Sequence, residues 1–226
     1  MKQCLLICAG ESDPGSLAFY KEKNKDKSIY IIAAEGGVKS CKEAGLVPDL
    51  IVGDFDSLEG NYPDYYPLDI YPGIEVISLP KEKDDTDTVY AIRLAADRGV
   101  KEIFMYGCGG GRMDHYIANI QTLLFAKDLG IDAFLCDSFD GKVTKAFVIK
   151  NEKVSFDKSF SGLVSVFCLG DAARGVDIKG LKYEVSGGEI RCDFPIGVSN
   201  EFTGKEASIS VREGALLIFL NNAPGF

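Results

Sequence analysis

The chain has 226 residues, 46% of them hydrophobic, which is enough for one large domain or two modest ones, each with its own core. Its 34 acidic and 25 basic residues give a formal net charge of −9. Such a charge argues against a protein that grips the phosphate backbone of a long nucleic acid, so we expect no nucleic acid partner.

The opening residues predict a buried first strand. Their apolar stretch spans only Cys4 to Ala9 and runs into Glu11 and Asp13, which does not fit a signal peptide. No later segment approaches the roughly 20 apolar residues that cross a bilayer. Seven cysteines without a C-x-x-C pair indicate reduced, packed thiols. We therefore expect a cytoplasmic protein with no membrane partner.

The first 140 residues alternate strand and helix patterns. Short β-rich runs occur at QCLLICAG, IYIIAA, LIVGD, EVISL, EIFMYG and DAFLCD. Helical patterns lie between several of them, at 38–44, 85–99 and 114–130. This alternation predicts an α/β domain over residues 1–141, with a mostly parallel sheet covered on both faces.

The remaining residues, 142–226, predict a second domain made of strands. Short strand-like pieces are separated by Gly, Asn and Asp turns, as in a β-sandwich or an open barrel. The stretch SVREGALLIFL predicts a terminal hairpin that turns at Glu213 and Gly214.

Acidic side chains follow two strands of the predicted sheet. Asp54 and Asp56 end the LIVGD run, and their i, i+2 spacing in an extended chain would put both on one face. Asp84 and Asp87 come after the next strand, at a helix start, where they would face the same side of a first turn. Loop and helix-capping roles are the alternative explanation for each group.

If these acids meet, their charges would repel unless a cation neutralised them. Oxygen ligands favour Mg²⁺ or Ca²⁺, and Mg²⁺ usually completes its shell with water and substrate phosphates. Asp54, Asp56, Asp84 and Asp87 are therefore predicted to hold a metal that bridges a polyphosphate.

A glycine-rich loop with a cation follows the fifth strand. Gly107, Gly109, Gly110 and Gly111 precede Arg112, and a helix opens near Asp114. Backbone N–H groups at such a turn can bind an anion, and a guanidinium adds bidentate phosphate contacts. An ordinary strand-to-helix turn is the alternative, and neither G-x-G-x-x-G nor a P-loop is present. The acidic groups and this loop together predict phosphoryl transfer.

These stretches resemble the thiamine pyrophosphokinase family. The similarity is carried by PDLIVGDFDS at 48–57, KDDTDTVYAI at 83–92, GGGRMDH with Asn119, GVSNEF at 197–202 and GALLIF near the end. It implies an α/β domain followed by a β-sandwich in a homodimer. The implied reaction transfers the pyrophosphoryl group of ATP to thiamine, giving thiamine diphosphate and AMP.

Carried over by position, the four aspartates would hold Mg²⁺ and act in catalysis. Gly109, Gly110, Gly111, Arg112 and Asp114 would bind ATP, while Ser199 and Asn200 would recognise thiamine across the dimer interface. Where the family commonly has A-D-G-G this chain has AEGG, which leaves the role of Glu35 open, and it has no tryptophan for thiamine. The alternatives are a Mg²⁺-dependent nucleotide phosphohydrolase and a non-catalytic nucleotide or thiamine sensor.

Overall fold

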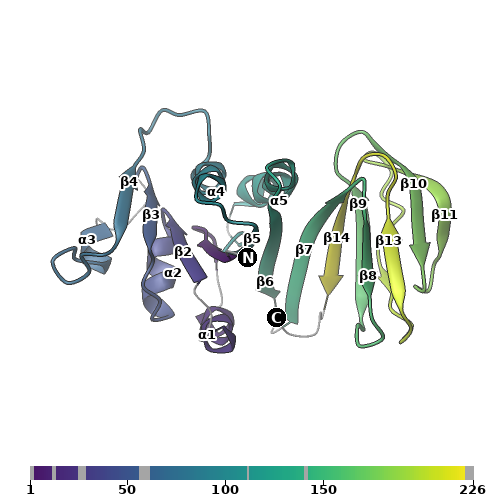
Figure 1. The fold of residues 1–226 in the computed structure, drawn as a ribbon, viewed down its shortest axis with the longest axis horizontal. Coiled ribbons are helices and arrows are strands. Elements are labelled where there is room, and N and C mark those ends of the chain that lie inside the picture. The colour runs from purple at the N-terminus through teal and green to yellow at the C-terminus, as the bar shows by residue number, and fades with distance from the viewer. Residues whose placement is uncertain are drawn as a thin grey trace.

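The computed structural model describes residues 3–11, 14–24, 29–55, 62–110, 112–139 and 142–221. Asp56 and Gly111, both predicted to be site residues, lie outside them. Six parallel strands form the first half of the molecule, in the order β6-β5-β1-β2-β3-β4 (Figure 1). Their bounds are β1 (Gln3–Ile7), β2 (Ile29–Ala34), β3 (Leu50–Gly53), β4 (Glu75–Ser78), β5 (Glu102–Tyr106) and β6 (Asp132–Phe139).

Helices cover both faces of these strands, since alternate residues point to opposite sides. In β1, Leu5 belongs to the core beneath α1 and α2, whereas Leu6 belongs to the core beneath α4 and α5. Figure 1 shows these two pairs on opposite sides of the sheet. The helices are α1 (Pro14–Lys23), α2 (Gly37–Glu43), α3 (Tyr62–Tyr65), α4 (Asp87–Asp97) and α5 (Met113–Asp128). The predicted doubly covered parallel sheet is confirmed, although α1 and α3 were not predicted.

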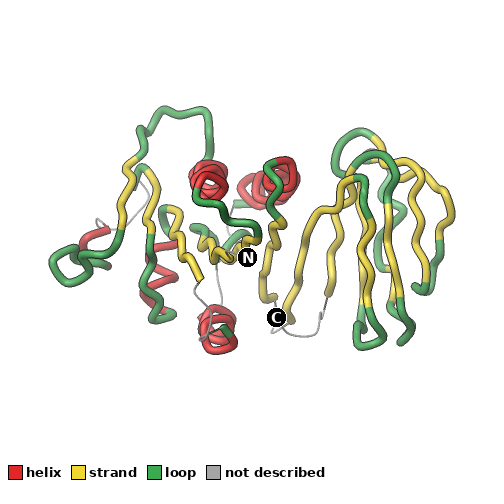
Figure 2. Tube along the Cα trace, viewed as in Figure 1, coloured by secondary structure: helices red, strands yellow, loops and turns green. Residues whose placement is uncertain are grey.

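The second half consists of strands and loops (Figure 2). Four strands form a separate sheet in the order β11-β10-β13-β8, and it packs on four further strands through a shared apolar core that includes Val166, Ile209 and Ile218. The predicted β-sandwich is confirmed. The bounds are β7 (Lys142–Lys150), β8 (Lys153–Phe156), β9 (Leu163–Cys168), β10 (Ala172–Lys179), β11 (Val185–Arg191), β12 (Asn200–Glu201), β13 (Ala207–Ser210) and β14 (Ala215–Asn221).

One sheet runs through both halves. β6 pairs with β7 in antiparallel register, from Phe134 opposite Phe147 to Phe139 opposite Lys142. The full order is β12-β9-β14-β7-β6-β5-β1-β2-β3-β4, so one layer of the sandwich continues the α/β sheet. The predicted division at residues 141 and 142 falls between the end of β6 at Phe139 and the start of β7 at Lys142, and it stays a prediction.

The predicted terminal hairpin is wrong. β13 pairs with β8 and β10, whereas β14 pairs with β7 and β9 in the other sheet. The turn around Gly214, with φ 104, therefore carries the chain from one layer to the other. The sequence misleads here because two apolar strands joined by Glu-Gly have the same pattern whether they pair or pack face to face.

The strand order reverses at β1. The chain builds β2, β3 and β4 outward on one side of β1, then returns to place β5 and β6 on the other. At such a reversal the connections leave in opposite directions and open a crevice at the carboxyl ends of the strands, where open α/β sheets bind ligands. Residues 8–11 after β1 line that crevice, together with Gly107, Cys108 and Gly110 after β5.

Among the described residues, no helix is long and apolar enough to span a membrane. All seven cysteines are free, and six are buried, which confirms the predicted packed thiols.

Candidate active site

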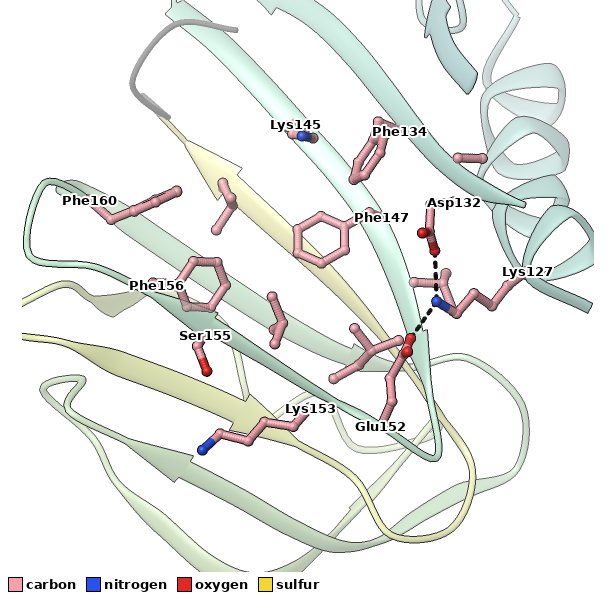
Figure 3. A pocket seen from close by; sticks show the side chains of 15 residues that line it. Lys127, Asp132, Phe134, Lys145, Phe147, Glu152, Lys153, Ser155, Phe156 and Phe160 are labelled. Carbon is pink, nitrogen blue, oxygen red and sulfur yellow. Dashed lines mark hydrogen bonds and ion pairs between the residues drawn. The ribbon is translucent and has the colours of Figure 1, made fainter. Parts of the chain in front are cut away.

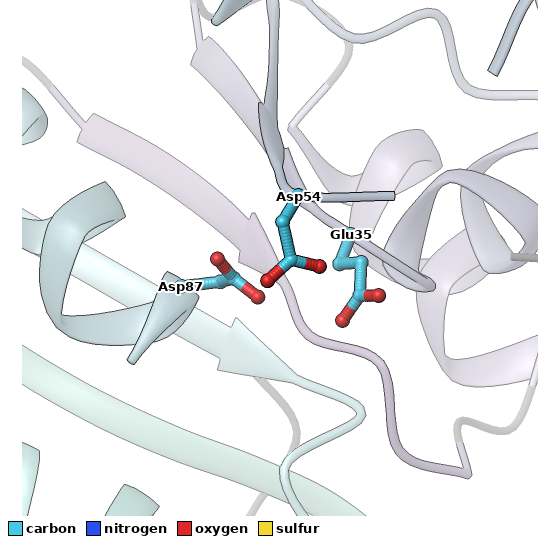
Figure 4. A group of neighbouring side chains, drawn as sticks. All are labelled: Glu35, Asp54 and Asp87. Atoms are coloured by element: carbon cyan, nitrogen blue, oxygen red, sulfur yellow. The ribbon is translucent and has the colours of Figure 1, made fainter. Parts of the chain in front are cut away.

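Three carboxylates from separate elements meet beside the crevice. Glu35 follows β2, Asp54 follows β3, and Asp87 opens α4. Each offers one oxygen that lies within 4.8 Å of the oxygens of the other two (Figure 4). The parallel neighbours β2 and β3 bring Glu35 and Asp54 to the same edge of the sheet. The predicted convergence of the two acidic stretches therefore holds for Asp54 and Asp87.

The backbone at these strand ends adopts the left-handed region. Glu35 has φ 43 and Phe55 has φ 59, conformations that cost roughly 1–3 kcal/mol each for residues other than glycine and that cluster at functional sites. The Glu35 N–H donates to the carbonyl of Val52, which fixes the turn after β2. The extended-chain argument for Asp54 and Asp56 is therefore wrong, because Phe55 between them is not extended.

The structure places Asp84 apart from this group. α4 begins at Asp87, and Thr86 is its N-cap, with its hydroxyl accepting from the Val89 N–H. Asp84 therefore lies before the first turn rather than on it, and its side chain is exposed. Its role as a metal ligand stays a prediction.

A lysine ammonium sits among the carboxylates. Lys83 Nζ lies 2.5 Å from Asp54 Oδ2 and 3.2 Å from Asp87 Oδ1. All three side chains are mostly buried, with 15%, 11% and 18% exposed. Burial raises the pKa of Asp87, an effect that the hydrogen bond from Lys83 opposes and the charges of Glu35 and Asp54 reinforce. For Lys83, burial lowers the pKa, but the hydrogen bonds to Asp54 and Asp87 outweigh it and the pKa is raised.

The glycine-rich loop after β5 packs directly on the segment after β1. Gly10 N–H donates to the Gly107 carbonyl and Glu11 N–H donates to the Gly109 carbonyl, at 2.8 and 2.9 Å. A Cβ at Gly10 would lie 2.2 Å from the Gly109 oxygen. Glycine is therefore required at this crossing, and the two segments form one wall of the crevice.

A buried carboxylate on β6 lies against this loop. The backbone N–H groups of Cys108 and Gly109 act on the Asp137 carboxylate, whose Oδ2 is buried without a hydrogen-bond partner among the described residues. Burial raises the pKa of Asp137 to about 6, against the lowering effect of those two N–H groups. The Gly109 N–H, predicted to bind phosphate, thus faces inward to Asp137.

The predicted phosphate-binding side chain stands at the surface. Arg112 is 71% exposed and forms a bidentate ion pair with Asp114, with Nη2 2.6 Å from Oδ2 and Nε 3.1 Å from Oδ1. Asp114 also accepts the His115 N–H. The hydrogen bond from Arg112 is the main cause that lowers the pKa of Asp114, to about 2.

One cleft of about 500 Å³, within the usual range for small-molecule sites, is lined by residues of both regions. Glu35, which follows β2, lines it together with Lys83 and Asp87, and so do Gly110 and Arg112, which follow β5 on the other side of β1 in the sheet. Cys8 and Cys108 line it too, with their Sγ atoms 3.7 Å apart. The hydrogen bond to Cys8, followed by burial, raises the pKa of the Cys108 thiol, which argues against a thiolate nucleophile.

Ser199 and Asn200 lie far from this cleft within one chain. Asn200 belongs to β12, at the outer edge of the long sheet, and is 5% exposed. Its Nδ2 donates to the Tyr183 carbonyl, and its Oδ1 accepts the N–H groups of Tyr183 and Glu201. Ser199, with φ 60, is exposed, and its N–H donates to Ser165 Oγ. Asn200 thus has a structural task, and thiamine recognition by either residue stays a prediction.

A second cavity of about 320 Å³ lies where the two halves join (Figure 3). Phe134, Phe147 and Phe156 line it, and Lys127 at its rim pairs with both Asp132 and Glu152. Its two carboxylates do not belong to a group of three converging acidic side chains within the described ranges, so it lacks the arrangement expected for phosphoryl transfer.

Sequence reasoning missed three residues of the site. The sequence marked Glu35 only as a departure from A-D-G-G, and the adjacency of β2 and β3 is what brings it to Asp54. Lys83 carried a local signal, since it stands four residues before Asp87. Asp137 carried none, because strand order alone brings it beneath the glycine-rich loop.

A cleft at the reversal of a doubly wound sheet, with clustered carboxylates on one side and a glycine-arginine loop on the other, defines a transferase of phosphoryl groups. Family models described as "Thiamin pyrophosphokinase, catalytic domain" and "Thiamin pyrophosphokinase, vitamin B1 binding domain" match residues 21–135 and 149–216. The chain belongs to the thiamin pyrophosphokinase family.

Individual proteins agree with this assignment. The thiamine pyrophosphokinase of Bacillus subtilis (strain 168) is 24% identical over 193 residues, which cover 85% of this chain and 87% of that protein. The crystal structure of thiamine pyrophosphokinase from Bacillus subtilis has a TM-score of 0.79 at 21% identity, covering 99% of this chain and 100% of that one. Thiamin pyrophosphokinase from Candida albicans has a TM-score of 0.77 at 16% identity, covering 97% of this chain and 90% of that one.

Proposed function

We propose that this enzyme transfers the pyrophosphoryl group of ATP to thiamine, giving thiamine diphosphate and AMP, with Mg²⁺ as cofactor, in the cytoplasm. The observation that carries the proposal is the shared cleft, which is lined both by Glu35 and Asp87 of the carboxylate group and by Gly110 and Arg112. Membership of the family supports the choice of thiamine as acceptor.

The donor set fits a hard divalent cation. Three carboxylate oxygens lie within 4.8 Å of one another, and the buried Asp87 Oδ1 has the Lys83 ammonium 3.2 Å away as its ion-pair partner. Glu35, Asp54 and Asp87 would hold Mg²⁺, with Asp56 and Asp84 as further predicted ligands. When bound, Mg²⁺ supplies charge neutralisation on phosphate oxygens.

The chain contributes positioning and electrostatics. Release of AMP requires that the thiamine hydroxyl oxygen form its bond to the β-phosphorus of ATP, while the bond from that phosphorus to the oxygen kept by AMP breaks. The hydroxyl proton leaves to a base. Arg112 and the loop at Gly110 would bind the triphosphate, and the buried carboxylates would orient its metal-bound end.

The acceptor site is proposed to come from a second chain. β12 is separated from β1 by six strand spacings in the sheet order, or about 29 Å at about 4.8 Å each. Ser199 therefore cannot reach the cleft of its own chain. Exposed apolar side chains surround that outer edge, as expected of a surface that pairs with a partner. They are Leu163, Tyr183, Phe194, Ile196 and Val198, with exposures of 42%, 63%, 64%, 58% and 48%. A homodimer would join one chain's outer edge to the other's cleft.

The test is product analysis with ATP, Mg²⁺ and thiamine. AMP and thiamine diphosphate should appear in equal amounts, and removal of Mg²⁺ by a chelator should stop both. ADP as product would mean an ordinary kinase, and nucleotide hydrolysis without thiamine would mean a phosphohydrolase. Binding of nucleotide or thiamine without turnover would mean a sensor.

A matched pair of variants tests the carboxylate group. Asp87→Asn should lower kcat/KM at least about 100-fold, because it removes a proposed metal ligand. Asp97→Asn, an exposed aspartate at the other end of α4, should leave kcat/KM within about twofold. Equal activity of the two folded variants would refute the role of Asp87.

A further inference from the structure

The position of Lys83 among the carboxylates has a consequence for metal binding. Its ammonium contacts Asp54 and Asp87, two of the three side chains whose oxygens converge. A positive charge thus already contacts two of the carboxylates that a divalent cation would use. We infer, on the basis of the proposed function, that Lys83 forms ion pairs with the metal ligands in the absence of Mg²⁺ and that these ion pairs break when the metal binds.

The charges of the three carboxylates favour replacement of the Lys83 ammonium by a divalent cation. Three carboxylates carry −3 when ionised, and the Lys83 ammonium brings a single positive charge to two of them, Asp54 and Asp87. Lys83 therefore keeps these carboxylates together with one positive charge. A divalent cation offers twice the charge of an ammonium, and Mg²⁺ requires oxygens at about 2.0–2.1 Å with near-octahedral geometry.

Shared occupancy of the same oxygens is unfavourable. Lys83 Nζ lies 2.5 Å from Asp54 Oδ2, and a metal bound to that oxygen would bring two cations within a few ångströms in a mostly buried site. Their repulsion is strong where solvent screening is weak. Mg²⁺ and the Lys83 ion pairs therefore compete, and the metal affinity of the free enzyme is reduced by the strength of those pairs.

The Lys83 ammonium, once released, can bind the phosphates of the nucleotide. Lys83 belongs to the segment between β4 and α4 and lines the cleft proposed to receive the triphosphate. A lysine has three donors on a flexible stem, so it can turn from carboxylates to phosphate oxygens without movement of the backbone. Lys83 would thereby link metal binding to nucleotide binding, since its ammonium would pair first with the carboxylates and then with the phosphates.

The principal experiment measures metal affinity without nucleotide. Mg²⁺ binding to Lys83→Met, followed by calorimetry, should be at least about tenfold tighter than to the unaltered enzyme, because the competing cation is gone. Lys81→Met is the matched control: it removes the same charge from the same cleft, and it should change the affinity less than about threefold. Equal or weaker Mg²⁺ binding by Lys83→Met overturns the exchange, and absence of binding in both proteins overturns the proposed metal site as well.

A second experiment uses the unaltered enzyme, so it does not depend on the folding of a variant. Lysines are acetylated briefly with and without Mg²⁺, and the modification of Lys83 is measured by mass spectrometry with Lys81 as internal reference. Mg²⁺ should raise the labelling rate of Lys83 several-fold relative to Lys81, since the ammonium leaves its carboxylate partners. A ratio that Mg²⁺ leaves unchanged or lowers overturns the inference.

Discussion

The carboxylate beneath the glycine-rich loop should make the stability of this enzyme depend on pH in an unusual direction. Burial raises the pKa of Asp137 from 3.8 to about 6. The folded protein thus retains a proton that the unfolded chain has already lost. The stability contributed by this proton is fully present below pH 3.8 and is lost as the pH rises through about 6.

The magnitude follows from the two pKa values. The interval between 3.8 and about 6, at about 1.36 kcal/mol per pH unit, corresponds to a ceiling of about 3 kcal/mol. About half of this is lost by pH 5, so the remaining loss between pH 5 and pH 8 is about 1.5 kcal/mol. Asp137→Asn keeps an oxygen beside the Cys108 and Gly109 N–H groups but cannot ionise.

The assay is urea unfolding of both proteins from pH 5 to pH 8. The free energy of unfolding of Asp137→Asn, relative to that of the unaltered enzyme, should increase by about 1–1.5 kcal/mol across this range, because only the unaltered enzyme loses this stability as the pH rises. Any loss of stability caused by the amide itself is the same at every pH, so it cancels when the change with pH is compared. Asp69→Asn, at an exposed aspartate, serves as the control variant and should follow the unaltered enzyme at every pH. A constant difference for Asp137→Asn would refute the reasoning.

Two further predictions concern the close approach of the loops and the outer edge of the sandwich. Gly10→Ala should raise the KM for ATP and destabilise the fold by about 1–3 kcal/mol, because the added Cβ would clash with the Gly109 carbonyl. Gly73→Ala is the control and should do neither, since a Cβ added there would have no atom of the described part of the chain within 4 Å. Asn200→Ala should lower the free energy of unfolding by about 1–3 kcal/mol in urea titrations, since the N–H and carbonyl of Tyr183 lose their partner. Stability equal to that of the unaltered enzyme would show that this side chain does not anchor the edge.

Features with a local cause were predictable from the sequence. The parallel strands follow from near-continuous apolar runs such as LIVG of β3, whose residues are all buried. α4 follows from its cap at Thr86 and its apolar positions Ala91, Ile92 and Ala95, all buried. α1 escaped notice because the apolar residues of PGSLAFYKEK do not recur at helical spacing.

Features that depend on the order of strands were not predictable. Glu35, Asp54 and Asp87 meet because β2 and β3 end, and α4 begins, at the same edge of the sheet. The sequence separations of these residues do not reveal that they are neighbours in space. The left-handed φ at Phe55 has the same character, since an Asp-Phe-Asp sequence in a strand alternates faces unless tertiary contacts override it. Asp137 meets the glycine-rich loop only because β6 pairs with β5.

The antiparallel pairing of β6 with β7 joins the two halves of the molecule into one continuous body, because a hinge between them would have to break that ladder. Opening and closing around ligands is then expected in the short segments that leave the strands. The same pairing ties the cleft to the far edge of the sheet within a chain. In a dimer, the gap between the two substrates would therefore be set by how two such bodies dock, so a substitution at the contact surface could retune catalysis without touching either binding site.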